Sequence, residues 1–425
     1  MKKTVLLALI VSVCCVNAGD TLHYTLDTLQ SIARKNYPQT RQLFLSQESV
    51  SQAVKNVNSA WLPRVAVAGS ATYQSEVPSL SLPPQLGFSM TEIPKDQYKA
   101  GIEVSQLLFD GGISHVQKNI EELSGKSDER KTESELRNLR SQISSTVENI
   151  LVLKESCAIL FYAKSDLEER RKVLSNAVEA GTAIASSRDE LDAEIFSTQE
   201  KIIDNKSTLA ACCKTLSLLA GISIDTDAVI SMEYSDSYGS LLSDDISGRP
   251  DYRQLEAQSE LLSSRISLIN RNNAPRLSAY ANGYYGRTGL NIYNIDMHFY
   301  GITGLNLSWN IGGNYSTLAQ KRQLAVSRES LEVQRQTLAL SVRLQLESVR
   351  EKIAKLKKMI TLDDRIAEIR TSVKKVAQQQ VDAGTMTISD YTVKLNDESA
   401  ALANRSIHRI QLAASYIEYK TILGK

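Results

Sequence analysis

The sequence contains few prolines and, beyond its first eighteen residues, no long apolar run. All eight prolines lie outside two tracts, residues 95–249 and 276–425, so either tract can hold uninterrupted helix. No later segment approaches the roughly 18 consecutive apolar residues that a transmembrane helix needs. If the chain crosses a membrane, we expect strands to do it.

The sequence also lacks an imbalance of charge. Its 49 Lys and Arg residues are interspersed with 48 Asp and Glu residues, which gives a formal net charge of +1. A nucleic-acid partner would favour a clustered basic surface. The composition therefore predicts no nucleic-acid binding.

Patterns typical of catalysis and of metal binding are missing too. We find no nucleophile–base pair, no Gly-rich phosphate loop and no paired carboxylates, so we expect no enzymatic activity and no cofactor. The four histidines lie far apart and share no ligand spacing with the cysteines. This distribution predicts no metal site.

The N-terminus has the pattern of a secretory signal over residues 1–18. Lys2 and Lys3 precede an apolar run, and a small residue, Ala18, ends the segment. The pattern predicts that the mature chain is exported. Cys14 and Cys15 follow the apolar run and leave lipid attachment as a rival interpretation, although bulky Val13 stands where a lipoprotein signal usually has a small residue.

The second half of the sequence repeats the first. Pro38 recurs as Pro250, 212 positions on (250 − 38), and Gly181 recurs as Gly384, 203 positions on (384 − 181). The change in offset falls in a segment rich in turn-forming residues, which is typical of a hairpin of variable length. The repeat predicts two units with the same elements in the same order.

Two very long helices are predicted, over residues 113–180 and 315–383. The second contains neither glycine nor proline, and the first contains only Gly125. In the second helix apolar residues recur at alternating intervals of four and three, the spacing of a coiled coil. This series comprises Leu338, Val342, Leu346, Val349, Ile353, Leu356 and Ile360, and it resumes in a shifted phase at Leu362, Ile366, Ile369, Val373 and Val376.

Each long helix is predicted to end at a glycine, turn back, and continue as a return helix over residues 189–220 or 390–423. The turn residues are Gly181, Thr182, Gly384 and Thr385. Residues 187–190 resemble a capping box, and residues 387–390 resemble a variant with aspartate at its fourth position.

Four strands are predicted just before the long helices, in two hairpins over residues 64–107 and 276–309. Apolar and polar residues alternate weakly over about 10 positions, as in a barrel wall between lipid and water. Two hairpins packed on a soluble core remain an alternative. Because about eight strands are needed to close even a filled barrel, four strands would require several copies of the chain to associate.

These elements give a mainly α fold with a small β part and two internal repeats. The predicted layout is a signal peptide at 1–18, a first repeat at 19–221, a linker at 222–249 and a second repeat at 250–425.

In this order, the motifs resemble the TolC family of outer-membrane efflux proteins. The matching segments are Leu26–Leu29 with Ala33, Asn36 and Pro38; Leu108–Gly112; Trp309–Gly313; Arg249–Asp251; and Gly384–Asp390. The resemblance implies a homotrimer in the cell outer membrane, with a 12-stranded transmembrane β-barrel and a periplasmic α-barrel of coiled-coil helices. It also implies a passive duct that works with a periplasmic adaptor protein and an inner-membrane pump.

The resemblance places Asp390 at the first of the aspartate rings that narrow the periplasmic end of such ducts. Three carboxylates facing one axis would attract cations. Alternatively, Asp390 only complements the dipole of its helix. A second acidic position is occupied by Val393, and the Tyr, Arg and Asp that commonly lock the tip fall on Val381, Met386 and Ser187. We therefore expect packing and caps, rather than a charged lock, to hold the tip.

Glycines are expected where each hairpin leads into its long helix, because a Cβ would obstruct a sharp bend there. These seam residues are Gly111, Gly112, Gly312 and Gly313.

Three cysteines remain after the predicted cleavage. A helical hairpin centred near Ala185 would place Cys157 and Cys213 at equal depth, which allows a disulfide between them in an oxidising periplasm. The other interpretation is that they are small apolar residues in a helix seam.

Two functions remain open. The first is an outer-membrane exit duct of a tripartite efflux or a type I secretion system, in contact with outer-membrane lipid. The second is a non-channel periplasmic coiled-coil protein with a structural or adaptor role.

Overall fold

A computed structural model describes residues 23–77, 93–232, 245–287, 296–311 and 315–424. The predicted signal peptide lies outside the described residues, as do the middle of the linker (233–244) and the tips of both hairpins. The first repeat contains the elements β1 (His23–Thr25), α1 (Leu26–Asn36), α2 (Thr40–Ser59), β2 (Arg64–Tyr73), β3 (Asp96–Phe109), α3 (Ile113–Glu179) and α4 (Ala185–Ala220). The second contains α5 (Pro250–Arg271), β5 (Arg276–Arg287), β6 (His298–Ser308), α6 (Thr317–Asp382) and α7 (Ile388–Ile422), with β4 (Val229–Ser231) between the repeats.

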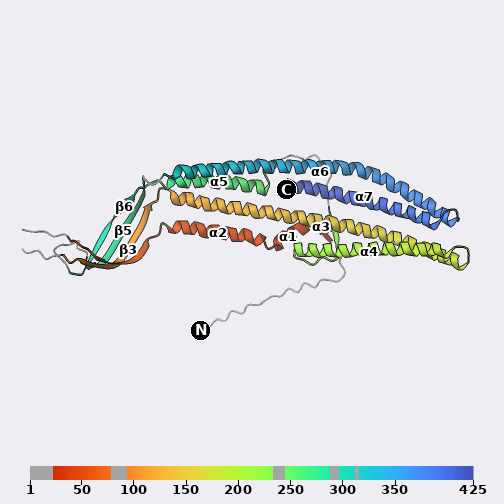
Figure 1. Ribbon diagram of the computed structural model, residues 1–425, viewed down its shortest axis with the longest axis horizontal. Coiled ribbons are helices and arrows are strands. Elements are labelled where there is room, and N and C mark those ends of the chain that lie inside the picture. The colour runs from red at the N-terminus through yellow and green to blue at the C-terminus, as the bar shows by residue number, and fades with distance from the viewer. Residues whose placement is uncertain (1–22, 78–92, 233–244, 288–295, 312–314, 425) are drawn as a thin grey trace, which may run out of the picture. The chain divides into compact units, whose positions relative to one another are not determined.

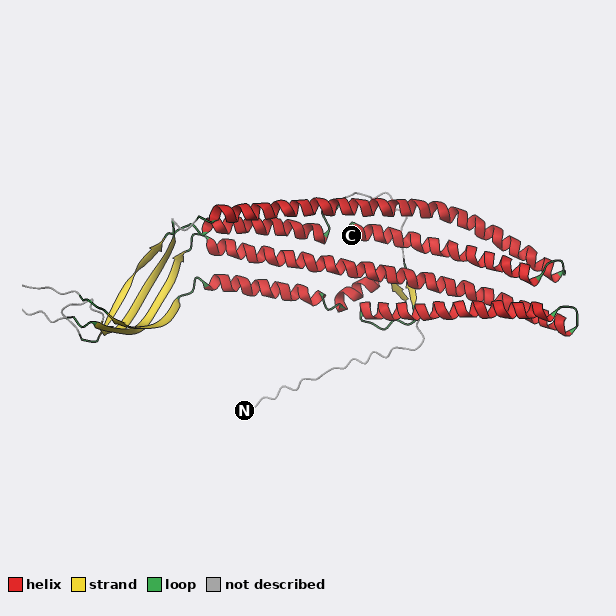
Figure 2. Ribbon diagram, viewed as in Figure 1, coloured by secondary structure: helices red, strands yellow, loops and turns green. Residues whose placement is uncertain are grey.

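The predicted repeat is present in the structure. Each half has helical residues followed by two strands, a long helix and a return helix, in that order, although the first half divides its opening helical segment into α1 and α2. Figure 2 distinguishes the helices from the strands. The long helices α3 and α6 have 67 and 66 residues. No helix among the described residues carries a stretch apolar enough to cross a membrane.

The chain divides into two compact units. One contains residues up to 40, 135–246 and 341–425, and the other contains residues 41–134 and 247–340. The first unit holds α1, α4, α7, the small sheet and the later parts of the long helices. The second holds α2, α5, the large sheet and the earlier parts of the long helices (Figure 1).

In the first unit, α6 packs against α7 along its predicted apolar series. Leu356 is buried with Leu412 and Tyr416, and Ile353 and Ile360 pack against them. The residues of the shifted series behave differently, because their side chains are 38–62% exposed. These exposed residues are Leu362, Ile366, Ile369, Val373 and Val376. The shifted phase therefore leaves an apolar stripe that the described residues do not cover.

Polar anchors in the same unit tie the N-terminal segment to the helices. Thr25 caps α1 by accepting a hydrogen bond from the Thr28 amide at 3.3 Å. The Asn36 side chain donates to the Ala220 carbonyl at 2.9 Å, which links the end of α1 to the end of α4. Strands β1 and β4 pair in parallel beside them.

In the second unit, four antiparallel strands form one sheet in the order β2-β3-β5-β6. Each repeat contributes one hairpin, and the hairpins join where β3 pairs with β5. Within the described residues, β2 and β6 each have a single neighbour, so the backbone groups on their outer edges lack strand partners.

The two faces of this sheet differ in polarity. Because side chains alternate along a strand, the pairing places Glu103, Asn282, Tyr284 and Tyr300 on one face. There the Tyr284 hydroxyl donates to Glu103 at 2.6 Å. The opposite face is apolar and exposed, and its residues include Val65, Val67, Ile102, Phe299, Leu305 and Leu307. Val67 is 85% exposed and Phe299 83%.

Close contacts fix two glycines in this unit. A Cβ on Gly101 would lie 2.1 Å from the Gly283 carbonyl oxygen, so only glycine fits between β3 and β5. A Cβ on Gly125 would lie 2.2 Å from Val50, because α2 crosses α3 closely there. Gly125 in the first long helix is thus required by packing.

Candidate functional site

The two helix turns contain the predicted glycines in a left-handed conformation. Gly181 has φ of 73° and Gly384 has φ of 71°, and an added Cβ would meet no atom within 4 Å at either. The backbone conformation, not lack of space, therefore favours glycine. In each turn the next threonine closes the helix: the amide of Thr182 bonds to the Ala177 carbonyl at 2.9 Å, and that of Thr385 bonds to the Gln380 carbonyl at 2.8 Å.

Helix α7 begins with the side-chain cap expected from its sequence. The Asp390 amide donates to the Thr387 hydroxyl at 3.1 Å, and that hydroxyl donates to the Asp390 carboxylate at 2.7 Å. Asp390 is exposed in the first turn of the helix. Its charge therefore complements the helix dipole. A second role, in a ring of carboxylates around a shared axis, is compatible with this position.

The predicted cap of α4 is wrong. The helix begins at Ala185, and Ile184 is the N-cap residue without any side-chain hydrogen bond. Ser187 lies inside the first turn. The polar residues that resembled a capping box start three positions too late, because the turn after Gly181 is as short as the turn after Gly384.

Apolar side chains pack beneath both turns. Seven buried residues of α3, α4, α6 and α7 form one cluster, comprising Leu167, Leu174, Leu191, Ile195, Ala377, Tyr391 and Leu395. Val381 and Met386, which stand where the family commonly has polar lock residues, pack against this cluster. Packing therefore replaces polar contacts at those two positions.

A partly buried ionic network lies beside this cluster and was not predicted from the sequence; Asp382, at its outer end, is exposed. Arg170 of α3, 7% exposed, binds Asp382 of α6 at 2.5 Å. Lys374 of α6 binds Asp166 of α3 at 2.9 Å and Glu398 of α7 at 3.2 Å. The expectation that packing and caps take the place of charge is thus incomplete, because charged residues deeper in the helices also connect them.

Tyr391 joins the apolar cluster to this network. Its ring is fully buried, its hydroxyl donates to Asp166 at 2.7 Å, and the Arg170 guanidinium lies 5.2 Å from the ring centroid. Burial and the hydrogen bond to Asp166 raise the pKa of Tyr391. Burial alone would lower the pKa of Lys374, but its bonds to Asp166 and Glu398 outweigh burial and raise it. The sequence signal was slight: Asp166 and Arg170 are four residues apart on one helix face.

The predicted seam glycines of the first repeat lie at the start of α3 in the second unit. Gly111 and Gly112 have φ of 72° and 82°, and a Cβ on Gly111 would lie 2.5 Å from that of Ala274. Both conformation and space therefore favour glycine at this bend. Gly312 and Gly313 lie outside the described residues.

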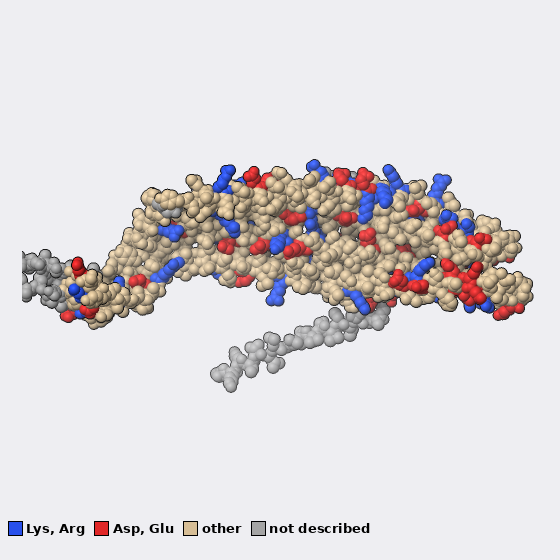
Figure 3. All heavy atoms as spheres, viewed as in Figure 1, with Lys and Arg blue, Asp and Glu red and all other residues tan. Residues whose placement is uncertain are grey.

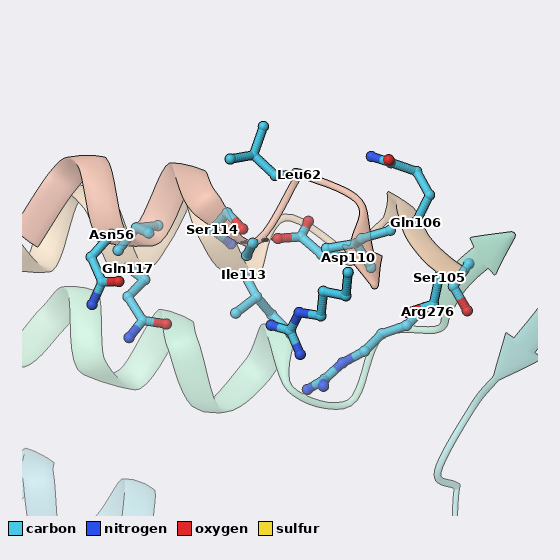
Figure 4. A pocket seen from close by; sticks show the side chains of 14 residues that line it. Asn56, Leu62, Ser105, Gln106, Asp110, Ile113, Ser114, Gln117 and Arg276 are labelled. Atoms are coloured by element: carbon cyan, nitrogen blue, oxygen red, sulfur yellow. Dashed lines mark hydrogen bonds between the residues drawn. The ribbon is translucent and has the colours of Figure 1, made fainter. Parts of the chain in front are cut away.

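Asp110 caps α3 at this seam. Its carboxylate accepts from the Gly112 amide at 2.8 Å. It also accepts from the Ser114 amide at 2.6 Å, as drawn in Figure 4. Burial alone would raise the pKa of Asp110, but the hydrogen bonds from Ser114 and Gly112 outweigh it, so the pKa lies below its usual value. Asp110 thus stays ionised at the positive end of the helix.

The disulfide considered between Cys157 and Cys213 is not formed, and both thiols are buried and free. The α3–α4 hairpin is centred near Gly181, because Ser156 bonds to Asn205 across it. Residues at equal depth in an antiparallel hairpin have the same sum of residue numbers. That sum is 361 for the bonded pair (156 + 205) and 370 for the two cysteines (157 + 213). At 1.5 Å per residue, the offset of nine places Cys213 roughly 13 Å along the helix from the level of Cys157. A disulfide needs the Cα atoms within about 7 Å.

Charged side chains are spread over the helices on the face drawn in Figure 3. Among the described residues, no group of three or more His, Cys, Asp or Glu residues is arranged to hold a metal ion.

Comparison with known structures identifies the fold. VceC, an outer membrane protein of Vibrio cholerae, matches with a TM-score of 0.71 and 14% identity over 94% of this chain and 96% of VceC. The outer membrane channel CmeC of Campylobacter jejuni matches with a TM-score of 0.69 and 13% identity, over 94% of this chain and 85% of CmeC. The MtrE outer membrane channel of Neisseria gonorrhoeae, in its open state, also matches with a TM-score of 0.69 and 13% identity, over 94% of this chain and 88% of MtrE.

A scan against protein-family models and a search of curated proteins found no match. The structural likeness confirms the fold predicted from the TolC resemblance, including its mainly α composition and its two repeats.

Proposed function

We propose that this chain is one protomer of a homotrimeric outer-membrane exit duct. Four strands from each copy would form a 12-stranded transmembrane barrel, and the long and return helices of the three copies would form a periplasmic α-barrel. The duct would be passive and have no enzymatic activity. A periplasmic adaptor protein and an inner-membrane pump would supply cargo and energy.

The observation that carries this proposal is the four-stranded sheet with one exposed apolar face and two open edges. Exposing a continuous apolar face that includes Val67 and Phe299 to water would be unfavourable, whereas lipid would accommodate the whole face. In lipid the outer edges of β2 and β6 must also find partners, because unpaired backbone groups cost several kcal/mol there. Edge-to-edge association of copies satisfies both requirements.

The exposed apolar stripe on α6 supports the same assembly. Ile366, Ile369 and Val373 recur at coiled-coil spacing, and they are exposed among the residues that the structure describes. A helix of another copy would cover them. An efflux duct and a type I secretion duct use this arrangement alike, and the cargo is either small molecules or proteins.

Membrane fractionation and channel recording test the proposal. We expect the protein in the outer-membrane fraction, extracted only by detergent, with a mass of three copies by light scattering. Purified protein should produce discrete conductance steps in a planar bilayer. A water-soluble monomer in the periplasmic fraction would reject the duct and favour the periplasmic coiled-coil role.

Within the duct, we propose that Asp390 lines a cation-selective constriction. Three exposed carboxylates around one axis would draw cations to the opening. Asp390→Ala should reduce cation over anion selectivity, measured from the reversal potential in a salt gradient. Glu190→Ala is the matched control, because it removes an exposed acidic side chain from the first turns of α4. Unchanged selectivity in Asp390→Ala would reject the ring.

A further inference from the structure

A cavity of about 480 Å³ lies at the strand-to-helix seam of the first repeat. Its wall is formed by the end of α2, the starts of β2 and β5, the end of β3 and the first turns of α3. Figure 4 shows Arg276, at the start of β5, among the side chains that line the cavity. All of these residues belong to the second unit.

Two arginines line this cavity at matching positions of the two repeats. Arg64 begins β2 and Arg276 begins β5, 212 positions apart (276 − 64). A third, Arg271, lies beside the seam, with guanidinium atoms 3.7 Å from where a Cβ of Gly112 would be. Among the described residues, none of the three arginines has an ion-pair partner.

The cavity contains one acidic side chain, and that carboxylate is already engaged. Asp110 directs its two oxygens to the amides of Gly112 and Ser114. Two guanidinium groups thus share a cavity with a single carboxylate that helps to cap a helix. Two positive charges placed this close together favour the binding of an anion. The planar guanidinium group of arginine can donate two parallel hydrogen bonds to the oxygens of a phosphate group.

Neutral donors complete a lining suited to phosphate oxygens. Asn56, Ser105, Gln117 and Ser278 line the same cavity. Their amides and hydroxyls can donate hydrogen bonds to oxygens that the arginines do not reach.

Aromatic side chains around the seam indicate where such an anion comes from. Trp61, Phe109 and Trp309 lie within a few residues of the strand ends and are 38%, 50% and 58% exposed. The Trp309 indole donates to the Asn273 carbonyl at 3.0 Å, which holds the ring beside the start of β5. Tryptophan concentrates at the boundary between membrane and water, at the level of lipid headgroups.

We propose that this cavity binds the phosphate of an anionic phospholipid headgroup, held between Arg64 and Arg276 at the membrane surface. The lipid source rests on the proposed function, since it requires the strands to lie in a membrane. The bound headgroup fixes the depth at which the sheet meets the helices.

The test uses the full-length protein, delipidated in an uncharged detergent. Short-chain phosphatidylglycerol is titrated while binding is followed by native mass spectrometry and by the melting temperature. Matched short-chain diacylglycerol, which lacks phosphate, and inorganic phosphate alone serve as the comparison ligands. We expect binding of the phosphatidylglycerol and little binding of either comparison ligand.

The variant Arg64→Gln/Arg276→Gln should weaken phosphatidylglycerol binding about tenfold or more, because each lost contact is a charge-assisted hydrogen bond. Arg64→Lys/Arg276→Lys keeps the charge without the fork and should bind at an intermediate level. The matched control Arg265→Gln/Arg322→Gln removes two exposed arginines of the same unit that lie outside the cavity, and should leave binding unchanged.

Several results would overturn the proposal. Equal lipid binding by the Gln variant and the wild type would show that the arginines hold no headgroup. Inorganic phosphate binding as tightly as the lipid would identify a phosphate site without a lipid role. Loss of the oligomer in the Gln variant, with lipid binding retained, would show that a carboxylate of a second copy occupies the cavity.

Failure of the proposed function would be seen separately. A water-soluble monomer would remove the membrane and hence the lipid source. The comparison of wild type with the Gln variant using short-chain phosphatidylglycerol would still report on the cavity itself.

Discussion

The two helix turns of the first unit close alike but begin their return helices differently. Gly181 and Gly384 have nearly the same φ, and each is followed by a threonine that bonds back to the long helix. The N-cap residue then differs: Thr387 binds the amide of the third residue of α7, whereas Ile184 offers α4 no side-chain hydrogen bond. The same turn therefore leads into one capped helix and one uncapped helix.

The difference continues into the packing. Leu191 and Tyr391 are the first buried residues of their helices and are 200 positions apart (391 − 191), whereas the turn glycines are 203 apart (384 − 181). Helix α4 thus buries its first side chain three residues later than α7, nearly one helical turn. The first turn of α7 places a large aromatic ring in the core, whereas the first turn of α4 contains no buried residue.

The seams of the second unit differ in the opposite sense. Asp110 precedes the glycine pair of the first repeat and caps α3 with two hydrogen bonds. The residue before Gly312 is Ile311, which is 72% exposed and has no polar side chain to offer. The residue directly before the glycine pair is therefore a charged cap in the first repeat and an apolar residue in the second.

The largest expected effect comes from removing the ring that only the second turn places in the core. Tyr391→Ala should lower the free energy of unfolding by about 3–5 kcal/mol, because it leaves a cavity and removes the hydrogen bond that the Tyr391 hydroxyl donates to Asp166. Thermal and denaturant unfolding, followed by circular dichroism, would measure it.

Two variants calibrate this effect. Leu191→Ala, the matched change in α4, should cost about 2–4 kcal/mol, since it removes packing without a polar contact. Tyr391→Phe removes only the hydroxyl and should cost about 1 kcal/mol. Equal costs for Tyr391→Ala and Tyr391→Phe would mean that the ring contributes no packing, and the contrast between the two turns would fail.

Much of this arrangement could be predicted from local sequence signals. Glycine and threonine set the turns, Thr387 and Asp390 set the cap of α7, and the proline-free tracts set the long helices. Each of these signals acts within a few residues of chain, so a sequence displays it directly.

What could not be predicted depends on contacts distant in sequence. The network of Arg170, Lys374 and Tyr391 joins three helices, and the four-residue spacing of Asp166 and Arg170 within α3 does not identify their partners on α6 and α7. Whether Cys157 and Cys213 lie at equal depth depends on the centre of the hairpin, and the offset of nine residues between them displaces them by roughly 13 Å along the helices.

The second largest expected effect is at the seam that carries a cap. Asp110→Ala should lower the free energy of unfolding by about 2 kcal/mol at neutral pH, through loss of two charge-assisted hydrogen bonds. Because folding lowers the pKa of Asp110, its stabilisation is complete above the usual carboxyl pKa and is lost as the pH falls through the folded value.

The melting temperatures of wild type and Asp110→Ala should therefore converge as the pH falls below about 4. Asp110→Asn, which keeps an acceptor without the charge, should lie between them at neutral pH. A gap between wild type and Asp110→Ala that stays constant down to pH 2 would show that the carboxylate charge contributes nothing to the cap.

The third comparison concerns the long helices, of which only α3 carries a glycine in its earlier part. Gly125→Ala should destabilise by about 1–2 kcal/mol, because the new methyl group would meet Val50, although alanine favours an unconstrained helix by about 1 kcal/mol. Arg328→Ala at the corresponding position of α6 (125 + 203) is exposed and should change little. If denaturant unfolding shows that Gly125→Ala is more stable than the wild type, α2 does not pack closely enough against α3 to exclude a methyl group at this position.

The smallest expected effects exchange the two N-caps. Thr387→Ala should cost about 1 kcal/mol, because the Asp390 amide loses its acceptor. Ile184→Thr should stabilise by up to about 1 kcal/mol, since Ile184 is 68% exposed and its φ and ψ of −88° and 143° are close to the −76° and 155° of Thr387. Melting temperatures of both single variants and of the double variant would measure this. The two effects should add, because each cap acts on its own helix. If Ile184→Thr gives no gain while Thr387→Ala gives the expected loss, the start of α4 is determined by its packing, and the missing cap is not what delays its first buried side chain.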